Sequence, residues 1–451
     1  MEDTIAVIST ALGIGAISII RISGNDAISI VNKVSKSKKL LEVPSHTIHY
    51  DHILDDEKIV DEVLISVMRE PKTFTRENVV EINAHGGIAT TNKILEVLLK
   101  NGCRLAEPGE FTKRAFLNGR IDLTQAEGIM DLINAKTEKA RTLAVNQVDG
   151  KVSTLIKELR QEIIEVLANI EVNIDYPEYE DIEEMTIQKI IEKTEKIESK
   201  IKLILKESEN GKLIKEGIKT SIIGRPNVGK SSLLNKLIGE EKAIVTEIEG
   251  TTRDIVEGTL NIDGIILNII DTAGIRKTED IVESIGVKKS LELIEKSDLI
   301  LYVLNNNDLI NDEDIELLSK LKDKNYMVIV NKMDLDTKLD ISNIDLKYVV
   351  RTSTINDSGI EKIKQVIKEI FNLEQIEKED LNYLSNARSI AILNKALTSI
   401  NEIKNGINNN MPIDMIEINI KEVWNLLGEI IGETYQEELI DQLFSQFCLG
   451  K

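Results

Sequence analysis

The sequence predicts a chain of mixed α/β and all-helical parts: an N-terminal α/β domain, a helical domain, and a second α/β domain inserted into the helical one. Between residues 217 and about 373, apolar runs of strand length alternate with helical segments. That alternation is typical of βαβ units on a parallel-rich sheet with helices on both faces. Apolar residues recur at helical spacing on both sides of this segment. We therefore predict domains at residues 1–117, 118–215, 216–375 and 376–451, of which the second and fourth form one helical domain.

The first 117 residues mix strand-like runs with turn residues, and the pattern predicts a helix over Thr91–Lys100. The uncharged run Thr4–Ile20 is shorter than the ~20 residues that a membrane span needs, and acidic residues precede it where a signal peptide is basic. Its β-branched residues, divided by Gly13 and Gly15, predict two strands and a loop.

The helical domain is predicted from apolar stripes at spacings of three or four residues. The stripes run over 148–170, 187–204 and 390–403, and an acidic stretch at 175–184 separates the first two. The strands predicted for the inserted domain are 218–223, 265–270, 299–304, 326–330 and 348–351.

Composition limits the function. The chain has 451 residues, a formal net charge of −21 and only 3% aromatic residues. An acidic chain with few aromatics does not present a general nucleic-acid surface or a base-stacking platform. Two cysteines are too few for a disulfide framework or a four-ligand zinc site. We expect a cytoplasmic, multidomain protein that does not bind membranes.

Residues 224–231 read Gly-Arg-Pro-Asn-Val-Gly-Lys-Ser and fit the phosphate-loop pattern G-x-x-x-x-G-K-[ST]. They follow a predicted strand and precede a predicted helix, as this motif requires. Backbone N–H groups of such a loop approach phosphates, and the helix N-terminus favours anions. Lys230 would reach the β- and γ-phosphates, and the Ser231 hydroxyl would ligate Mg²⁺.

Three further elements follow in the order expected of a Ras-like P-loop GTPase domain. Asp271–Gly274, after a predicted strand, suits an aspartate near Mg²⁺ and a glycine whose N–H faces the γ-phosphate. The pair Thr251 and Thr252 offers hydroxyls to Mg²⁺ and the γ-phosphate. Asp334, in Asn-Lys-Met-Asp after another strand, can accept two hydrogen bonds from guanine that adenine cannot supply together. The inserted domain is therefore predicted to bind guanine nucleotides.

The catalytic residues depart from the Ras pattern. Ras-like enzymes orient the attacking water with a glutamine just after the glycine of the motif that is Asp271–Gly274 here. This chain has Ile275 at that position. Another group must therefore act, or hydrolysis is very slow. Asn227 could help to hold a monovalent cation where an arginine finger would sit, although its position alone favours an ordinary turn residue.

Taken together, the motifs resemble the tRNA-modification GTPase MnmE (TrmE) family almost from end to end. The resemblance rests on residues 3–5, 21–24, 73–77, 85–87 and 108–127, on the G-domain motifs, and on the C-terminal Phe-Cys-Leu-Gly-Lys at 447–451.

This resemblance implies an N-terminal domain that forms a homodimer and binds a folate, namely 5-formyltetrahydrofolate or methylenetetrahydrofolate, as one-carbon donor. It also implies that the chain forms a heterotetramer with a flavin-binding partner, MnmG (GidA). Together the two proteins would add an aminomethyl or carboxymethylaminomethyl group to C5 of the wobble uridine, position 34, of certain tRNAs. GTP hydrolysis, stimulated by K⁺ and dependent on pairing of G domains, would accompany the reaction.

Carried over residue by residue, the resemblance implies a K⁺ site of Asn227, Thr246, Ile248 and Thr251, and a Mg²⁺ site of Ser231 and Thr252. Glu283 would act on the attacking water indirectly. The remaining GTP contacts would come from the residues of the four motifs: Val228, Gly229, Lys230, Ser232, Glu247, Glu249, Gly250, Asp271, Thr272, Ala273, Gly274, Asn331, Lys332 and Asp334.

The implied folate contacts are Arg21, Glu81, Arg120 and Lys451. A carboxylate such as Glu81 can accept paired hydrogen bonds from a pterin ring, while cations suit the acidic tail. Cys448 would lie near the folate site as a possible reactive thiol. The segment 352–354 is Thr-Ser-Thr where the family usually has a Ser-Ala pair, which makes the guanine contact there less regular.

Two other functions stay open on the sequence alone. One is a GTP-switched module for ribosome or RNA assembly, against which the N-terminal and C-terminal motifs argue. The other is an N-terminal folate-dependent transferase that works independently of GTP.

Overall fold

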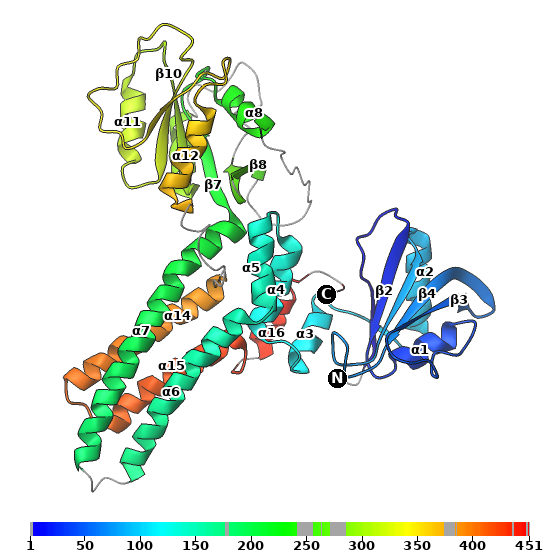
Figure 1. Cartoon of the computed structure of the whole chain (residues 1–451). Coiled ribbons are helices and arrows are strands. Elements are labelled where there is room, and N and C mark those ends of the chain that lie inside the picture. Colours follow the sequence, from blue (N-terminus) through cyan, green and yellow to red (C-terminus); the bar gives the residue numbers. More distant parts are fainter. Residues whose placement is uncertain are drawn as a thin grey trace. The chain divides into compact units, whose positions relative to one another are not determined.

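The computed structural model describes residues 3–175, 180–240, 256–262, 264–270, 286–373, 384, 386–434, 437–447 and 450 (Figure 1). The chain divides into two compact units. Unit 1 comprises residues 1–130, 147–197 and 392–451, and unit 2 comprises residues 131–146 and 198–391. The predicted boundaries at 117, 215 and 375 stay predictions.

Unit 1 begins with a six-stranded sheet, sheet A, in the order β3-β4-β5-β2-β1-β6. Its strands are β1 (Ile5–Ile8), β2 (Ile17–Ser23), β3 (Thr47–Asp55), β4 (Lys58–Met68), β5 (Val79–His85) and β6 (Arg104–Leu105). All neighbours are antiparallel except β1 and β6. Helices α1 (Ala27–Val34) and α2 (Ile88–Lys100) contribute to the same buried core as the sheet.

The side chains of β2 and β5 alternate between the two faces of sheet A. Ile20, Ile22 and Ile82 are fully buried in the core beneath the helices. Because successive side chains of a strand point to opposite faces, Arg21 and Glu81 lie on the other face, which we call the outer face. The two strands and loop predicted for Thr4–Ile20 are confirmed by β1 and β2, and the helix predicted over Thr91–Lys100 by α2.

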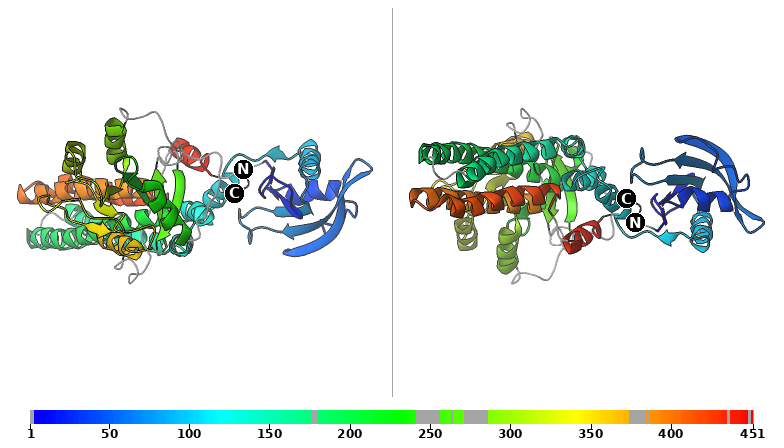
Figure 2. Two further views of the ribbon diagram at one scale, coloured as in Figure 1. Left: turned by 90° about the horizontal axis from the view of Figure 1, so that it is seen from above. Right: turned by 90° about the horizontal axis from the view of Figure 1, so that it is seen from below.

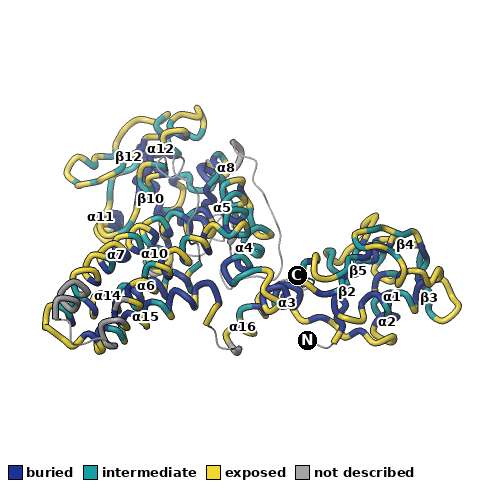
Figure 3. The backbone as a smooth tube through the Cα atoms, turned by 60° about the horizontal axis from the view of Figure 1, so that its bottom comes forward, coloured by how far each residue is buried: buried dark blue, intermediate teal, exposed yellow. Residues whose placement is uncertain are grey.

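The rest of unit 1 is helical. Its elements are α3 (Glu110–Leu117), α4 (Leu123–Asn134), α5 (Glu138–Val148), α6 (Lys151–Asp175), α7 (Glu180–Glu216), α14 (Ala387–Asn408), α15 (Ile413–Ile431) and α16 (Glu437–Phe444), of which α4, α5, α7 and α14 extend into unit 2. Helices α6 and α15 run side by side in both views of Figure 2. Buried and exposed positions alternate along these helices, as the predicted stripes require (Figure 3).

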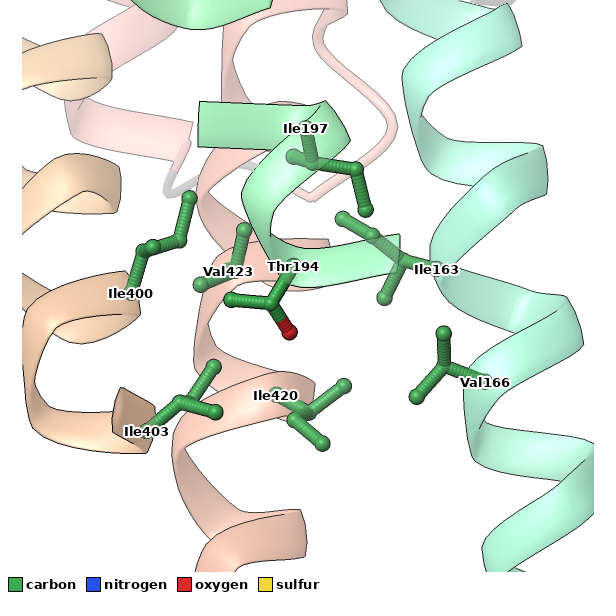
Figure 4. Close-up of a pocket in the computed structure, with 8 residues that line it drawn as sticks. All are labelled: Ile163, Val166, Thr194, Ile197, Ile400, Ile403, Ile420 and Val423. Atoms are coloured by element: carbon green, nitrogen blue, oxygen red, sulfur yellow. The ribbon is translucent and has the colours of Figure 1, made fainter. Parts of the chain in front are cut away.

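A small cavity of about 20 Å³ lies where α6, α7, α14 and α15 meet (Figure 4). Seven of its eight lining side chains are Ile or Val, and the eighth is Thr194. A site so poor in polar partners does not order a water or a polar ligand. This cavity is therefore a packing gap in the bundle.

Unit 2 contains a second six-stranded sheet, sheet B, in the order β12-β11-β10-β7-β9-β8. The strands are β7 (Ile218–Ile223), β8 (Val256–Ile262), β9 (Ile265–Ile270), β10 (Leu299–Asn305), β11 (Tyr326–Asn331) and β12 (Val349–Arg351). Neighbouring strands are parallel except for β8 and β9. All five predicted strands are confirmed, and β8 is an additional strand that the sequence pattern did not predict.

Helices cover both faces of sheet B. Leu299, Leu301 and Val303 of β10 belong to a core that includes α8 (Lys230–Glu240) and α12 (Ile360–Ile370). Alternate residues of the same strand, Ile300 and Tyr302 among them, belong to a core that includes α10 (Gly286–Lys296) and α11 (Asp312–Lys320). The predicted parallel-rich sheet with helices on both faces is therefore confirmed. No helix in the described part of the chain is both long enough and apolar enough to cross a membrane.

A buried ion-pair network fastens α3 to sheet A. Arg114 is 1% exposed, and its guanidinium contacts Asp3 at 2.9 Å, Glu110 at 2.9 Å and Glu77 at 3.2 Å. Arg104 adds a 2.6 Å contact to Glu110. Burial alone would raise the pKa of Glu110, but hydrogen bonds from Arg104, from the backbone of Glu107 and from Arg114 bring it below the ordinary 4.5. Glu110 therefore stabilises the fold above pH ~4.5, and this stabilisation is lost as the pH falls through the lowered pKa.

We expect Arg114→Met to lower the free energy of unfolding of unit 1 by about 3–5 kcal/mol, because it leaves buried carboxylates without a counter-charge. Urea unfolding followed by the fluorescence of Trp424, the single tryptophan of the chain, measures this in unit 1. The matched control is Lys100→Met, which removes an exposed cation of unit 1 that is paired with Glu96. This control should leave the transition unchanged, and equal effects of the two substitutions would contradict the role given to the network.

Candidate functional site

The phosphate-loop segment connects β7, which ends at Ile223, to α8, which begins at Lys230. Gly224 has φ +150°, and a Cβ there would lie 2.3 Å from the carbonyl oxygen of Val303. Only glycine fits so close to the backbone of β10. The strand, loop and helix predicted around this motif are thus present, and the loop begins against the middle of sheet B.

Lys230 points back into its own loop. Its Nζ donates hydrogen bonds to the carbonyl oxygens of Gly224 at 2.6 Å and Arg225 at 2.7 Å. Burial lowers the pKa of this ammonium. Removed from water in this way, the ammonium is an effective partner for phosphate oxygens.

The Asn-Lys-Met-Asp motif begins at the end of β11 and is joined directly to the phosphate loop. Asn331 is fully buried, and its Nδ2 donates to the carbonyl oxygen of Val228 at 3.0 Å. A Cβ on Gly229 would lie 2.3 Å from this same Nδ2, so Gly229 is needed for the approach. Lys332 Nζ donates to the carbonyl oxygen of Asn227 at 2.7 Å. Two of the predicted motifs therefore form one connected structure.

Asp334, the last residue of this motif, is exposed, and Ser353 holds its carboxylate. The Ser353 Oγ donates to Asp334 Oδ1 at 2.5 Å, while the Thr352 Oγ1 donates to Asn331 Oδ1 at 3.2 Å. Both hydroxyl residues are buried. The residues at 352–354, which differ from the pair usual in the family, thus supply side-chain donors to the Asn-Lys-Met-Asp motif. The role of these hydroxyls was not predicted, because their partners Asn331 and Asp334 lie 21 and 19 positions away in the sequence.

A second missed residue, Arg225, fixes the other side of the phosphate loop. Its Nε lies 3.1 Å from Asp314, and its Nη2 donates to the carbonyl oxygen of Leu309 at 3.1 Å. Asp314 is fully buried at the start of α11, where it also accepts a hydrogen bond of 2.9 Å from the hydroxyl of Tyr302. Burial and the neighbouring carboxylate raise the pKa of Tyr302, so its hydroxyl remains a donor. No motif in the sequence marks this network.

Several predicted site residues lie outside the described part of the chain. They are Thr246, Glu247, Ile248, Glu249, Gly250, Thr251, Thr252, Asp271, Thr272, Ala273, Gly274, Glu283, Cys448 and Lys451. Ser231 and Ser232 lie in the first turn of α8.

Three of the four residues expected to bind folate, Arg21, Glu81 and Arg120, lie on or beside the outer face of sheet A. Arg21 and Glu81 are register partners on β2 and β5, and Arg21 Nε donates to Glu81 Oε1 at 2.8 Å. Arg21 Nη1 also donates to the carbonyl oxygen of Gly450 at 3.2 Å. The structure therefore brings Gly450 to the Arg21–Glu81 pair, although Gly450 is over 350 positions away in the sequence.

Arg120 lies beside the same aromatic cluster as Arg21. Its guanidinium carbon is 4.9 Å from the centroid of the Phe74 ring, and that of Arg21 is 5.8 Å from the centroid of Phe111. Phe74 packs against the cluster that contains Phe111. Sequence reasoning did not identify either ring. Cys103, the cysteine in the described residues, is buried, and burial raises the pKa of its thiol to about 12, so it is no nucleophile at neutral pH.

Comparison with known proteins extends over the whole chain. The family profile described as the N-terminus of the GTP-binding protein TrmE matches residues 4–120, and the profile described as the MnmE helical domain matches residues 123–448. A protein named tRNA modification GTPase MnmE from Bacillus thuringiensis (strain Al Hakam) is 55% identical over 455 residues, with 100% of this chain and 99% of the relative covered. Its namesake from Listeria welshimeri is 55% identical over 454 residues, with the same coverage. Among solved structures, the G domain of the T. maritima FeoB iron transporter covers 34% of this chain and 98% of its own, at 25% identity and a TM-score of 0.24.

We expect Asp334→Asn to weaken GTP binding by about 10- to 100-fold and to strengthen binding of xanthosine triphosphate. The amide would present a donor to the guanine donors, whereas xanthine offers a carbonyl at that position. Fluorescence titration with GTP and with xanthosine triphosphate measures the two affinities. The matched control is Asp336→Asn, the same change at an exposed aspartate two residues away, which should leave both affinities unchanged. Unaltered GTP affinity in Asp334→Asn would contradict the proposed base contact.

Proposed function

The chain belongs to the MnmE family of tRNA-modification GTPases, and from that premise we propose that its GTP hydrolysis serves modification of C5 of the wobble uridine, position 34, in certain tRNAs. The group added would be aminomethyl or carboxymethylaminomethyl. The observation that carries the nucleotide half of this proposal is the junction of the phosphate loop with the Asn-Lys-Met-Asp motif through Asn331 and Lys332. One connected structure would then contact both the phosphates and the base of a guanine nucleotide.

In the nucleotide site, Lys230 would contact the phosphates and Asp334 the guanine. Ser231 is suitably placed at the start of α8 to ligate Mg²⁺, with Thr252 as the second protein ligand. Asn227 has φ +63° and is exposed beside the phosphates' expected position, and Lys332 engages its backbone carbonyl. Its side-chain oxygen is the group that would ligate K⁺, together with Thr246, Ile248 and Thr251. Glu283 would act on the attacking water indirectly.

In the N-terminal part, Glu81 would accept hydrogen bonds from the pterin ring of 5-formyltetrahydrofolate or methylenetetrahydrofolate. Arg21, Arg120 and Lys451 would contact the rest of the cofactor, and Cys448 would lie nearby as a possible reactive thiol. The support is the meeting of Arg21, Glu81 and the C-terminal segment at one place. The active assembly would be a homodimer that joins the flavin-binding protein MnmG in a heterotetramer and acts on tRNA in the cytoplasm.

Steady-state GTP turnover should be at least about 10-fold faster in KCl than in NaCl at equal ionic strength. An arginine finger accelerates GTP hydrolysis by a factor of ~10³–10⁵, and a bound cation in its place supplies part of that acceleration. Glu283→Ala should retain nucleotide affinity but lose turnover in both salts. Equal turnover of the wild-type protein in the two salts would contradict the K⁺ site, and weakened GTP binding by Glu283→Ala would contradict the role of Glu283.

Calorimetry with 5-formyltetrahydrofolate should detect binding to the full-length protein. Glu81→Gln should weaken this binding by about 10-fold or more, because the amide cannot accept the paired hydrogen bonds that a carboxylate accepts. The matched control is Glu62→Gln, which changes an exposed glutamate on the neighbouring strand β4. Absence of folate binding to the wild-type protein would favour instead a GTP-switched assembly module.

A further inference from the structure

A cleft of about 390 Å³ lies in unit 1, where the connection between α3 and α4 meets α6 and the end of α15. Its volume is in the range of small-molecule sites, which is about 300–1,000 Å³. Five of its lining residues are charged or carry an amide: Arg120, Asp122, Gln125, Lys157 and Glu433. The composition is that of a polar ligand site.

The acidic and amide groups of the cleft are already engaged. Asp122 accepts hydrogen bonds from the Thr124 hydroxyl at 2.6 Å and from the backbone N–H of Gln125 at 3.0 Å. Glu433 pairs with the buried Arg160. Gln125 donates to the carbonyl oxygen of Val148 at 2.8 Å and accepts from the backbone N–H of Asp122 at 3.0 Å. These groups are therefore committed to holding the walls of the cleft together.

The two cations of the cleft differ from its acidic and amide groups, because the described part of the chain engages neither of them in an ion pair. Within the described residues, neither Arg120 nor Lys157 forms an ion pair with a carboxylate, and both are exposed to the cleft opening. Arg76 adds a third cation nearby: its guanidinium donates to the carbonyl oxygen of Asn118 at 2.9 Å. Partial burial and this neighbouring charge lower the pKa of Arg120. The cleft thus holds two cations without ion-pair partners among the described residues, beside carboxylates that are engaged elsewhere, in a chain whose net charge is −21.

Two aromatic rings connect this cleft to the Arg21–Glu81 pair. Arg120 lies over Phe74, Phe74 packs against the cluster of Phe111, and Arg21 lies beside the Phe111 ring. Arg120 therefore both lines this cleft and contacts the aromatic cluster that Arg21 contacts, which makes it the residue at which a ligand bound near Glu81 would enter the cleft.

We propose that this cleft binds the glutamyl tail of the folate, with Arg120 meeting the first carboxylates and Lys157 those of further γ-linked glutamates. The inference rests on the folate binding proposed above and extends it by naming the form of the cofactor, a polyglutamate. The pterin itself does not suit the cleft. Its N–H donors need a carboxylate acceptor, and the carboxylates of the cleft, Asp122 and Glu433, are already engaged. An RNA backbone suits it less well, because nucleic-acid surfaces present longer basic tracks and stacking aromatics.

The test compares 5-formyltetrahydrofolate carrying one glutamate with the form carrying three, by calorimetry on the full-length protein. The wild-type protein should bind the triglutamate about 3- to 5-fold more tightly, as expected for one exposed ion pair between Lys157 and the added carboxylates. Lys157→Gln should abolish this preference and leave the monoglutamate affinity unchanged. Lys151→Gln, on another face of α6 and outside the cleft lining, should keep the full preference.

The outcomes separate the two proposals. If the wild-type protein binds neither form, the folate function fails and the tail site fails with it. If the monoglutamate binds but the triglutamate has no advantage, or if Lys157→Gln keeps that advantage, the tail site alone is overturned. Loss of binding of an anticodon stem-loop RNA in Lys157→Gln, with the folate preference intact, would assign the cleft to RNA phosphates and also overturn it.

Discussion

The buried carboxamide of Asn331 is the interaction on which the nucleotide site depends. Its Nδ2 donates to the phosphate loop at Val228, and its Oδ1 accepts from Thr352 in the segment that also holds Asp334 through Ser353. A fully buried amide cannot lose one of these partners without a cost of ~1–3 kcal/mol. These hydrogen bonds therefore hold the phosphate loop and the base-recognition segments at a fixed spacing. Such preorganisation reduces the ordering cost of binding.

The N-terminal site depends on an arrangement of the same kind, built from charges and close packing. Arg114 fastens α3 to sheet A, and α16 packs on α3 through Phe116 and Phe444. Gly109 permits this packing, because a Cβ there would lie 2.4 Å from the carbonyl oxygen of Phe444. The chain beyond α16 then passes so close to β1 that a Cβ on Gly450 would lie 2.9 Å from Ser9 Cα. In this way Gly450 reaches Arg21, which pairs with Glu81.

The local sequence pattern predicted most of the helices and strands, but it did not predict most of the contacts between them. The strands over 218–223 and 265–270 were predicted with their observed bounds, because continuous apolar runs bounded by turn residues are a local signal. Strand β8 was missed, since it lies at the sheet edge and its Glu, Gly, Thr and Asn residues interrupt the apolar pattern. Ser353, Arg225, Phe74 and the charged cleft were missed for a different reason. Their roles arise from partners far away in the sequence, such as Asp334, Asp314 and Arg120, which no spacing rule connects.

The acidic composition excluded a general nucleic-acid surface but did not exclude a tRNA substrate, because positive charge can be concentrated locally or supplied by a partner protein. The central claim is that GTP hydrolysis by this chain serves modification of the wobble uridine. Nucleoside analysis of tRNA from cells that lack the protein, complemented with the wild type or with Lys230→Ala, tests it directly. We predict that the C5 modification of uridine 34 disappears and that only the wild type restores it. Persistence of the modification without the protein, or full restoration by Lys230→Ala, would contradict the account.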